Sequence, residues 1–261
     1  MATQSIAVAA PALGPGYYAR AFRKETQYEF VRMLRTKAFS LSVIGFPVIF
    51  FILFGISNRA SGYGEYLVPA YSCMGVVSAC LFGIGMALAM ERAQGWLEVK
   101  QASPMPRFVY LAAKVMGCAA FSLIIVALLT LLGVAFGGVK VTVPQVLELS
   151  GVILAGSVPF TAMALLAALL VPPNSGPGII NLIYLPMSFA SGFWMPIRYL
   201  PHWLQVIAPV LPTYHLAQLA LHPFGFARPG SMMIHWEALA GFTLLMLGVT
   251  WILFQRIEAK A

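Results

Sequence analysis

The stretch ERAQGWLE at residues 91–98, followed by SPMPR at residues 103–107, is a charged island between two long apolar runs. The run before it, 66–90, and the run after it, 115–139, contain no Lys, Arg, Asp or Glu. Moving a charged side chain into the hydrocarbon core of a membrane costs free energy. The island is therefore expected at a membrane surface, where another protein can bind it.

The composition is that of an integral membrane protein. Of the 261 residues, 60% are hydrophobic and 9% charged, and the mean hydropathy is +0.85, whereas a soluble domain is about 25% charged. Sixteen Lys and Arg stand against eight Glu and no Asp. The basic residues cluster beside apolar segments, which favours contact with membrane lipid over nucleic acid. Cys73, Cys80 and Cys118 lie inside apolar runs and are interpreted as packing residues.

Six helical spans are predicted from the uncharged windows. A helix needs roughly 20 apolar residues to cross about 30 Å of hydrocarbon. The window 149–197 is long enough for two crossings, and PPNSGP at 172–177 divides it because such clusters end helices. The windows are 38–58, 66–90, 115–139 with a start near Phe108, the two halves of 149–197, and 238–255.

The uncharged segment 199–227 is not counted as a crossing. Its prolines, among them Pro209 and Pro212, would leave backbone groups without hydrogen bonds in lipid. We expect residues 194–227 to form an outer re-entrant segment between spans five and six, made of two short helices at the extracellular end. The predicted fold is thus an all-α integral membrane protein with six transmembrane helices.

The basic residues indicate the orientation. With six spans both termini share a side, and that side carries eleven Lys and Arg against four on the other, which places both termini in the cytoplasm. The eleven are Arg20, Arg23, Lys24, Arg32, Arg35, Lys37, Arg92, Lys100, Arg107, Arg256 and Lys260, and the four are Arg59, Lys140, Arg198 and Arg228.

An amphipathic helix is predicted at residues 17–37, between a flexible cytosolic tail, 1–16, and the transmembrane domain, 38–256. A short cytosolic tail, 257–261, ends the chain. At 100° per residue one apolar face and one basic face result, which suits a helix lying in the cytoplasmic interface. The apolar face holds Tyr18, Ala19, Phe22, Phe30, Met33 and Leu34, and the basic face Arg20, Lys24, Arg32 and Arg35.

The sequence does not contain the motifs that several chemical functions require. No Gly-Lys dipeptide occurs, so there is no phosphate-binding loop of the Walker type. The four histidines between 202 and 235 have no spacing of a metal site, and none is predicted. An intramembrane protease, with Ser191 as nucleophile and His215 or His235 as base, is one alternative function. A membrane assembly scaffold without transport activity is the other.

The charged island has a specific pattern. Glu91-Arg92, then Gly95, Leu97-Glu98 and Ser103-Pro104, resembles the cytoplasmic loop of the type-2 permeases of ATP-binding-cassette exporters. A second match begins with SGFWMP at 191–196 and continues through Leu200-Pro201, Leu204-Gln205, Pro209 and Pro212-Thr213-Tyr214, similar to that family's outer segment. The departures from the pattern are Ala93, Trp96 and Lys100-Gln101.

The resemblance implies a permease subunit of the bacterial inner membrane that is not itself an enzyme and holds no cofactor. A separate ATPase subunit would bind ATP and magnesium, and a second permease copy would complete the path as a homodimer. The exported substrate would be lipid-like, drug-like or a glycan. The coupling loop, 91–107, would dock on the ATPase through Glu91, Arg92, Gly95, Leu97, Glu98, Ser103 and Pro104.

The translocation path has candidate residues of two kinds. Ser72, Ser78 and Asn181 are polar residues within spans, which could line the path or bond to neighbouring helices and their own backbone. Phe189 and Phe193 could close the path as an apolar constriction beneath the outer segment, or face lipid and the bundle core. Glu91 is expected as an exposed charge at the end of a span, so its removal should alter coupling more than folding.

Overall fold

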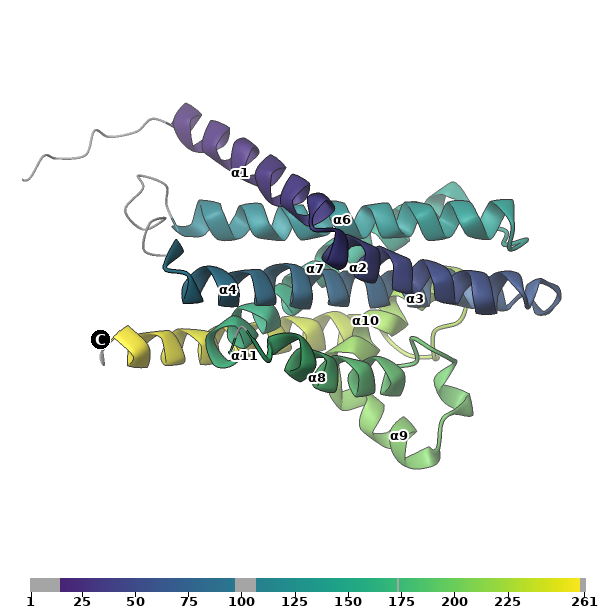
Figure 1. Cartoon of the computed structure of the whole chain (residues 1–261). Helices are drawn as coiled ribbons and strands as arrows, with labels where there is room; N and C mark the ends of the chain where they lie inside the picture. The colour runs from purple at the N-terminus through teal and green to yellow at the C-terminus, as the bar shows by residue number, and fades with distance from the viewer. Residues whose placement is uncertain (1–14, 97–106, 173, 259–261) are drawn as a thin grey trace, which may run out of the picture.

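The structure, a computed structural model, describes residues 15–96, 107–172 and 174–258. Within these ranges the chain is helical with connecting turns and contains no strand. Most helices lie along one common direction, while α1 diverges at one end of the bundle and α9 projects at the other (Figure 1). The all-helical prediction is confirmed.

Within the described residues, five helices are long and apolar enough to cross a membrane. Two of them change to π-helix part of the way along, so that α2 continues as η1 and α3 continues through η3 into α4. The elements of the five are α2 (Lys37–Phe50) with η1 (Phe51–Ile56), α3 (Tyr63–Cys80) with η3 (Leu81–Met86) and α4 (Ala87–Ala93), α6 (Arg107–Ala135), α7 (Val143–Leu170) and α11 (Met232–Glu258).

The predicted fifth span is shorter than the sequence suggests. Helix α8 (Gly176–Ala190) has 15 residues, which at a rise of 1.5 Å per residue cover only about 22 Å. The helix ends because Ser191 starts a turn in which Gly192 has a φ of +86°, a conformation that side chains other than glycine's disfavour. The apolar window extends to Ile197 although the helix ends at Ala190.

The outer segment is bent, as its prolines predict. Between η4 (Ile197–Tyr199) and α11 the chain forms α9 (His202–Ile207), η5 (Ala208–Val210), α10 (Pro212–Leu221) and η6 (His222–Phe224). The parts before and after Leu211 meet at 95°. Together they are long enough for one broken crossing, so the described residues allow five or six spans. The position of this pair in the outer leaflet stays a prediction.

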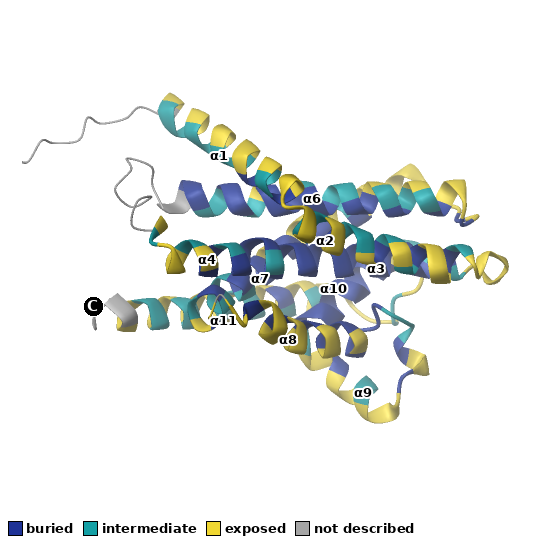
Figure 2. Ribbon diagram, viewed as in Figure 1, coloured by how far each residue is buried: buried dark blue, intermediate teal, exposed yellow. Residues whose placement is uncertain are grey.

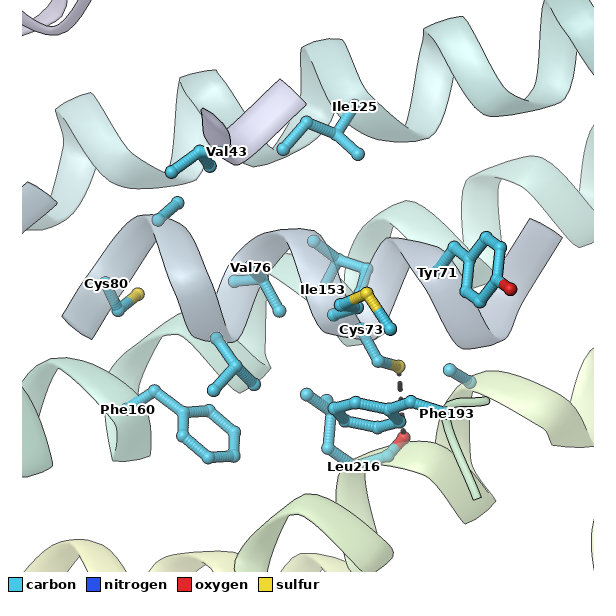
Figure 3. Packing of buried hydrophobic residues seen from close by; sticks show 14 of the residues in the cluster. Val43, Tyr71, Cys73, Val76, Cys80, Ile125, Ile153, Phe160, Phe193 and Leu216 are labelled. Carbon is cyan, nitrogen blue, oxygen red and sulfur yellow. Dashed lines mark hydrogen bonds between the residues drawn. The ribbon is translucent and has the colours of Figure 1, made fainter. Parts of the chain in front are cut away.

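The second span forms the centre of the bundle. In its most apolar window 83% of the residues are buried, against 22% in the first span and 6% in α11, and Figure 2 shows the same contrast. A helix that is apolar on every side is expected to be surrounded by others. The side chains of Cys73 and Val76 pack between Ile125, Ile153 and Phe193 (Figure 3), and the Cys73 thiol lies 3.8 Å from the Leu216 carbonyl.

Small residues let α6 and α7 approach this central span closely. A Cβ added at Gly85 would lie 3.2 Å from the backbone oxygen of Ala164. One added at Gly75 would lie 2.8 Å from Ile125 Cγ2. A backbone atom cannot move aside as a side chain can, so Gly85 fixes the distance between η3 and α7.

The helix α1 (Pro15–Arg35) packs against α6. Of the predicted apolar face, Met33 is buried and Phe22 and Phe30 are half-buried, but Ala19 and Leu34 are exposed. The buried side is therefore rotated from the predicted one, because Glu29 lies on it. The position of α1 in a membrane interface stays a prediction.

We predict that Gly85→Leu destabilises the bundle by about 1–3 kcal/mol, the usual cost of overpacking, because the new side chain meets the α7 backbone. Gly151→Leu is the matched control, since a Cβ there meets nothing within 4 Å. The melting temperatures of both variants in mild detergent provide the measurement. Equal melting temperatures for the two would contradict this account of the helix contact.

Candidate functional site

The coupling loop begins at the end of α4. Glu91 and Arg92 lie in the last turn of this helix, and Gly95 follows with a φ of +73°. Nothing lies within 4 Å of a Cβ built on Gly95, so the left-handed backbone, and not lack of space, is what favours glycine there. Trp96 follows and is 54% exposed. The other four residues predicted for coupling, Leu97, Glu98, Ser103 and Pro104, lie outside the described residues.

Glu91 is not the exposed end charge that the sequence analysis expects. Its Oε1 lies 3.1 Å from Lys114 Nζ and 3.6 Å from an Arg32 guanidinium nitrogen. The Tyr110 hydroxyl donates a hydrogen bond to its Oε2. The earlier expectation fails because α1 and α6 cover this side of α4 with groups of opposite charge.

Glu29 is the second carboxylate of this cluster. It is 1% exposed, and it lies 2.7 Å from Lys114 Nζ and 2.6 Å from Arg32 Nη2. Lys114 itself is 2% exposed. Two carboxylates and two cations sum to zero, which offsets the desolvation cost that an isolated buried charge carries. We call Glu29, Arg32, Glu91 and Lys114 the charge cluster.

The charge cluster joins three helices far apart in sequence. Glu29 and Arg32 come from α1, Glu91 from α4 and Lys114 from α6. On its other side α4 is held by Arg92, whose Nη1 donates to the Leu169 carbonyl at 2.8 Å. A cation at the carboxyl end of a helix is favourable because it meets carbonyls without intrahelical donors. The start of the coupling loop is thus fixed to α1, α6 and α7.

Sequence reasoning missed Glu29 and assigned no role to Lys114, Arg32 or Tyr110 here. Two signals were available. Lys114 is a cation inside an apolar helix, which requires a partner. Glu29 lies four residues before the buried Met33 and therefore on the same face of the helix.

A groove of about 1380 Å³ lies beside the cluster. Its walls come from α1 and α2 on one side and from α3, η3, α4 and α8 on the other. Charged residues, including Arg32 and Glu91, line the part that borders the cluster. The other lining residues include four methionines and three phenylalanines, which are Met33, Met74, Met86, Met90, Phe39, Phe46 and Phe82.

The predicted path residues occupy different surroundings. Ser78 and Asn181 line the groove. Ser72 is buried, and its hydroxyl donates to the Val68 carbonyl at 2.7 Å. Phe189 is 39% exposed on α8, whereas Phe193 is fully buried in the core. The structure brings Ser78 and Asn181 together and separates them from Phe193. A role in transport stays a prediction for all five.

The serine–histidine pair of a protease is not formed. The Ser191 hydroxyl donates to the Met187 carbonyl at 2.7 Å and contacts the Thr213 hydroxyl. His215 instead faces His235, with 2.8 Å between their Nδ1 atoms. Among the described residues there is also no group of three or more His, Cys, Asp or Glu that could hold a metal ion.

We predict that Lys114→Met costs about 3–5 kcal/mol of stability, the usual effect of removing one partner of a buried ion pair. The charge cluster would then hold two carboxylates and one cation, Arg32. Adding Glu29→Gln to Lys114→Met should restore part of the loss, because the excess negative charge disappears. Thermal unfolding in detergent gives the measurement, with Lys140→Met at an exposed position as control. A loss in the control as large as that of Lys114→Met would contradict the cluster's role.

Comparison with known proteins agrees with the two motifs. The model of the family described as "ABC-2 type transporter" matches residues 20–224. The protein of Bacillus subtilis (strain 168) that carries the name transport permease YvfS is 27% identical over 200 residues, which cover 74% of this chain and 81% of that protein. The matched range includes most of α1, the charge cluster, the groove and the bent outer pair. The chain belongs to the ABC-2 type transporter family.

Proposed function

We propose that this chain is the permease subunit of an exporter, and that it moves a lipid-like, drug-like or glycan substrate outward while a separate ATPase subunit hydrolyses ATP. Membership of the ABC-2 family implies partnership with an ATP-binding subunit. The observation that carries the proposal is the charge cluster, which connects the start of the coupling loop to the walls of the groove.

The cluster offers a route for mechanical coupling. A partner that displaces the loop after α4 also displaces Glu91, and separating Glu91 from Lys114 and Arg32 in a medium of low dielectric would cost several kcal/mol. The helices α1, α4 and α6 therefore move together. Because α1 and α4 both line the groove, their joint movement changes its width.

The groove's lining supports a lipid-like or drug-like substrate more than a glycan. Methionine side chains are flexible and polarizable, and surfaces rich in them adapt to apolar ligands of different shapes. A glycan requires many hydrogen-bonding side chains along its path, whereas the lining is mainly aliphatic, aromatic and methionine. The charged end would accept a polar head group.

A homodimer follows as part of the proposal. Large apolar side chains are exposed on α2 and α8, which line the groove, and on η1, which continues α2. In the bilayer such surfaces are covered by lipid or by a second copy, and pairing two grooves would enclose a path between them. The exposed side chains include Ile49, Ile52, Leu53, Leu182 and Ile183.

The arrangement of the chain ends supports a multi-pass protein of the bacterial inner membrane with both termini in the cytoplasm. The start of α1, the end of α4 and the carboxyl end of α11 lie at the same end of the bundle (Figure 1). Basic residues are concentrated in the segments at this end, as the positive-inside rule requires of a cytoplasmic side.

The direct test is co-purification with an ATPase. The tagged chain, extracted in mild detergent from its own organism, should retain an ATP-binding subunit, and ATP hydrolysis should depend on it. A chain that purifies without any ATPase and keeps its fold would contradict the proposal and favour the assembly scaffold.

We expect Trp96→Ala to weaken ATPase binding or uncouple hydrolysis from transport, with little change in stability, because Trp96 is exposed beside Gly95 at the start of the coupling loop. Trp251→Ala is the matched control, since this tryptophan is 64% exposed on α11. Pull-down of the ATPase and melting temperature are measured together. Equal ATPase retention and coupling in both variants would place the docking surface elsewhere.

Asn181→Phe should lower transport at least about tenfold by filling the groove, an effect typical of a changed binding pocket. Leu244→Phe, at a position of α11 that is 72% exposed and outside the groove lining, should leave transport near the wild-type level. The amount of amphiphile that remains bound to each purified variant, counted by native mass spectrometry, gives a second readout. Equal binding and transport in the two variants would exclude the groove as the path.

A further inference from the structure

The buried His215 and the half-buried His235 form a hydrogen-bonded pair between the outer segment and the last span. His215 belongs to α10, and His235 lies in the first turn of α11. Their Nδ1 atoms are 2.8 Å apart, and their ring centroids are 5.1 Å apart. The Tyr214 ring packs edge-on against both imidazoles, at 5.4 and 5.8 Å. Helix α10, which carries His215, lies away from the end of the bundle at which α4 ends (Figure 1).

The protonation state of the neutral pair follows from its third contact. His215 Nε2 lies 2.9 Å from the Pro209 carbonyl, and a carbonyl oxygen can only accept a hydrogen bond. His215 Nε2 is therefore the donor, and its Nδ1 carries a lone pair when the ring is neutral. His235 must then donate from its own Nδ1–H to complete the bond between the rings.

The pair can accept one extra proton without losing the hydrogen bond between its rings, but not a second. A first extra proton goes to His235 Nε2, which leaves the Nδ1–H···Nδ1 bond intact and makes it charge-assisted. A second must go to His215 Nδ1, where it faces the Nδ1–H of His235. Two N–H groups and two positive charges would then lie 2.8 Å apart, and the bond is lost.

Other charged and titratable groups of the surrounding helices are engaged elsewhere. Glu148 of α7 lies 3.6 Å from His222 of η6, and Arg228 donates to the Gln205 side chain at 3.2 Å. On α11, Glu237 is exposed two residues beyond His235, which places it on another face. On the packed parts of α3 and α8 three further titratable groups bond to the backbone: Tyr66 to Gly192, Cys73 to Leu216 and Tyr184 to Met74. Tyr71 of α3 is buried in the core.

We propose that His215 and His235 form an acid-sensitive latch that holds the bent outer pair against α11. His215 connects three places at once: α10 itself, the bend before α10 through Pro209, and the first turn of α11. In the neutral and singly protonated states the latch is closed. In the doubly protonated state α10 and the start of α11 separate, and the outer segment loosens.

Hydrogen–deuterium exchange of the purified full chain in lipid nanodiscs tests the latch without any transport assay. After correction for intrinsic exchange rates, amides of 212–221 and 232–238 should lose about tenfold protection between about pH 7 and about pH 5, a range that brackets the ordinary histidine pKa of about 6.5. This experiment does not depend on the proposed function, because it needs neither substrate nor ATPase.

Two substitutions at one position separate the latch from general packing. In His235→Asn the side-chain amide can donate to His215 Nδ1 or, turned over, accept from it, so protection should be equal at both pH values. In His235→Ala the bond is absent, and the segment should exchange at about pH 7 as fast as the wild type does at about pH 5. His222→Asn, which removes the neighbouring histidine, should keep the wild-type response. The proposal is overturned if His235→Asn loosens in acid as much as the wild type, or if the wild type does not respond.

Discussion

The buried charge cluster is the constraint on which the end of the bundle that holds α1 and α4 depends. Glu29 and Lys114 are almost fully buried, and either charge alone would cost several kcal/mol in this environment. If α1, which carries Glu29, or α6, which carries Lys114, rotates or withdraws, the charge on the other helix loses its partner. This explains why α1 turns an acidic residue inward instead of presenting only apolar side chains.

The central span imposes the second constraint. Because α3 and η3 are surrounded by helices, their small residues set how closely the backbones pack. Gly85 against Ala164 keeps η3 close to α7. On the opposite side the first span covers less of the centre, since only 22% of its window is buried. The groove forms on this side, between the weakly covered α2 and the cluster-bound α4.

Much of the fold could be predicted from composition, because uncharged windows of sufficient length have few alternatives in a membrane. The prolines on either side of Leu211 likewise allowed the bend of the outer segment to be predicted. The end of α8 could not be predicted from hydropathy, since Ser191 to Ile197 is apolar enough for a span while Gly192 turns the backbone. At the site, Glu91 and Gly95 were identified by their motif. Glu29 was missed because its helix was interpreted through its apolar residues, and its partner Lys114 is distant in sequence.

Polar bonds between side chains concentrate toward the two ends of the bundle. The charge cluster fixes α1, α4 and α6 to one another, and the histidine pair fixes α10 to α11. Between these two networks, the hydroxyls of Ser72, Ser78 and Ser122 bond to carbonyls of their own helices. Bonds that cross between helices there, such as that from the Tyr184 hydroxyl to the Met74 carbonyl at 3.1 Å, join uncharged groups, and the rest of the contact is apolar packing without directional bonds. A conformational change that preserves both networks therefore moves α1, α6 and the central span, which ends in α4, as a body relative to α10 and α11.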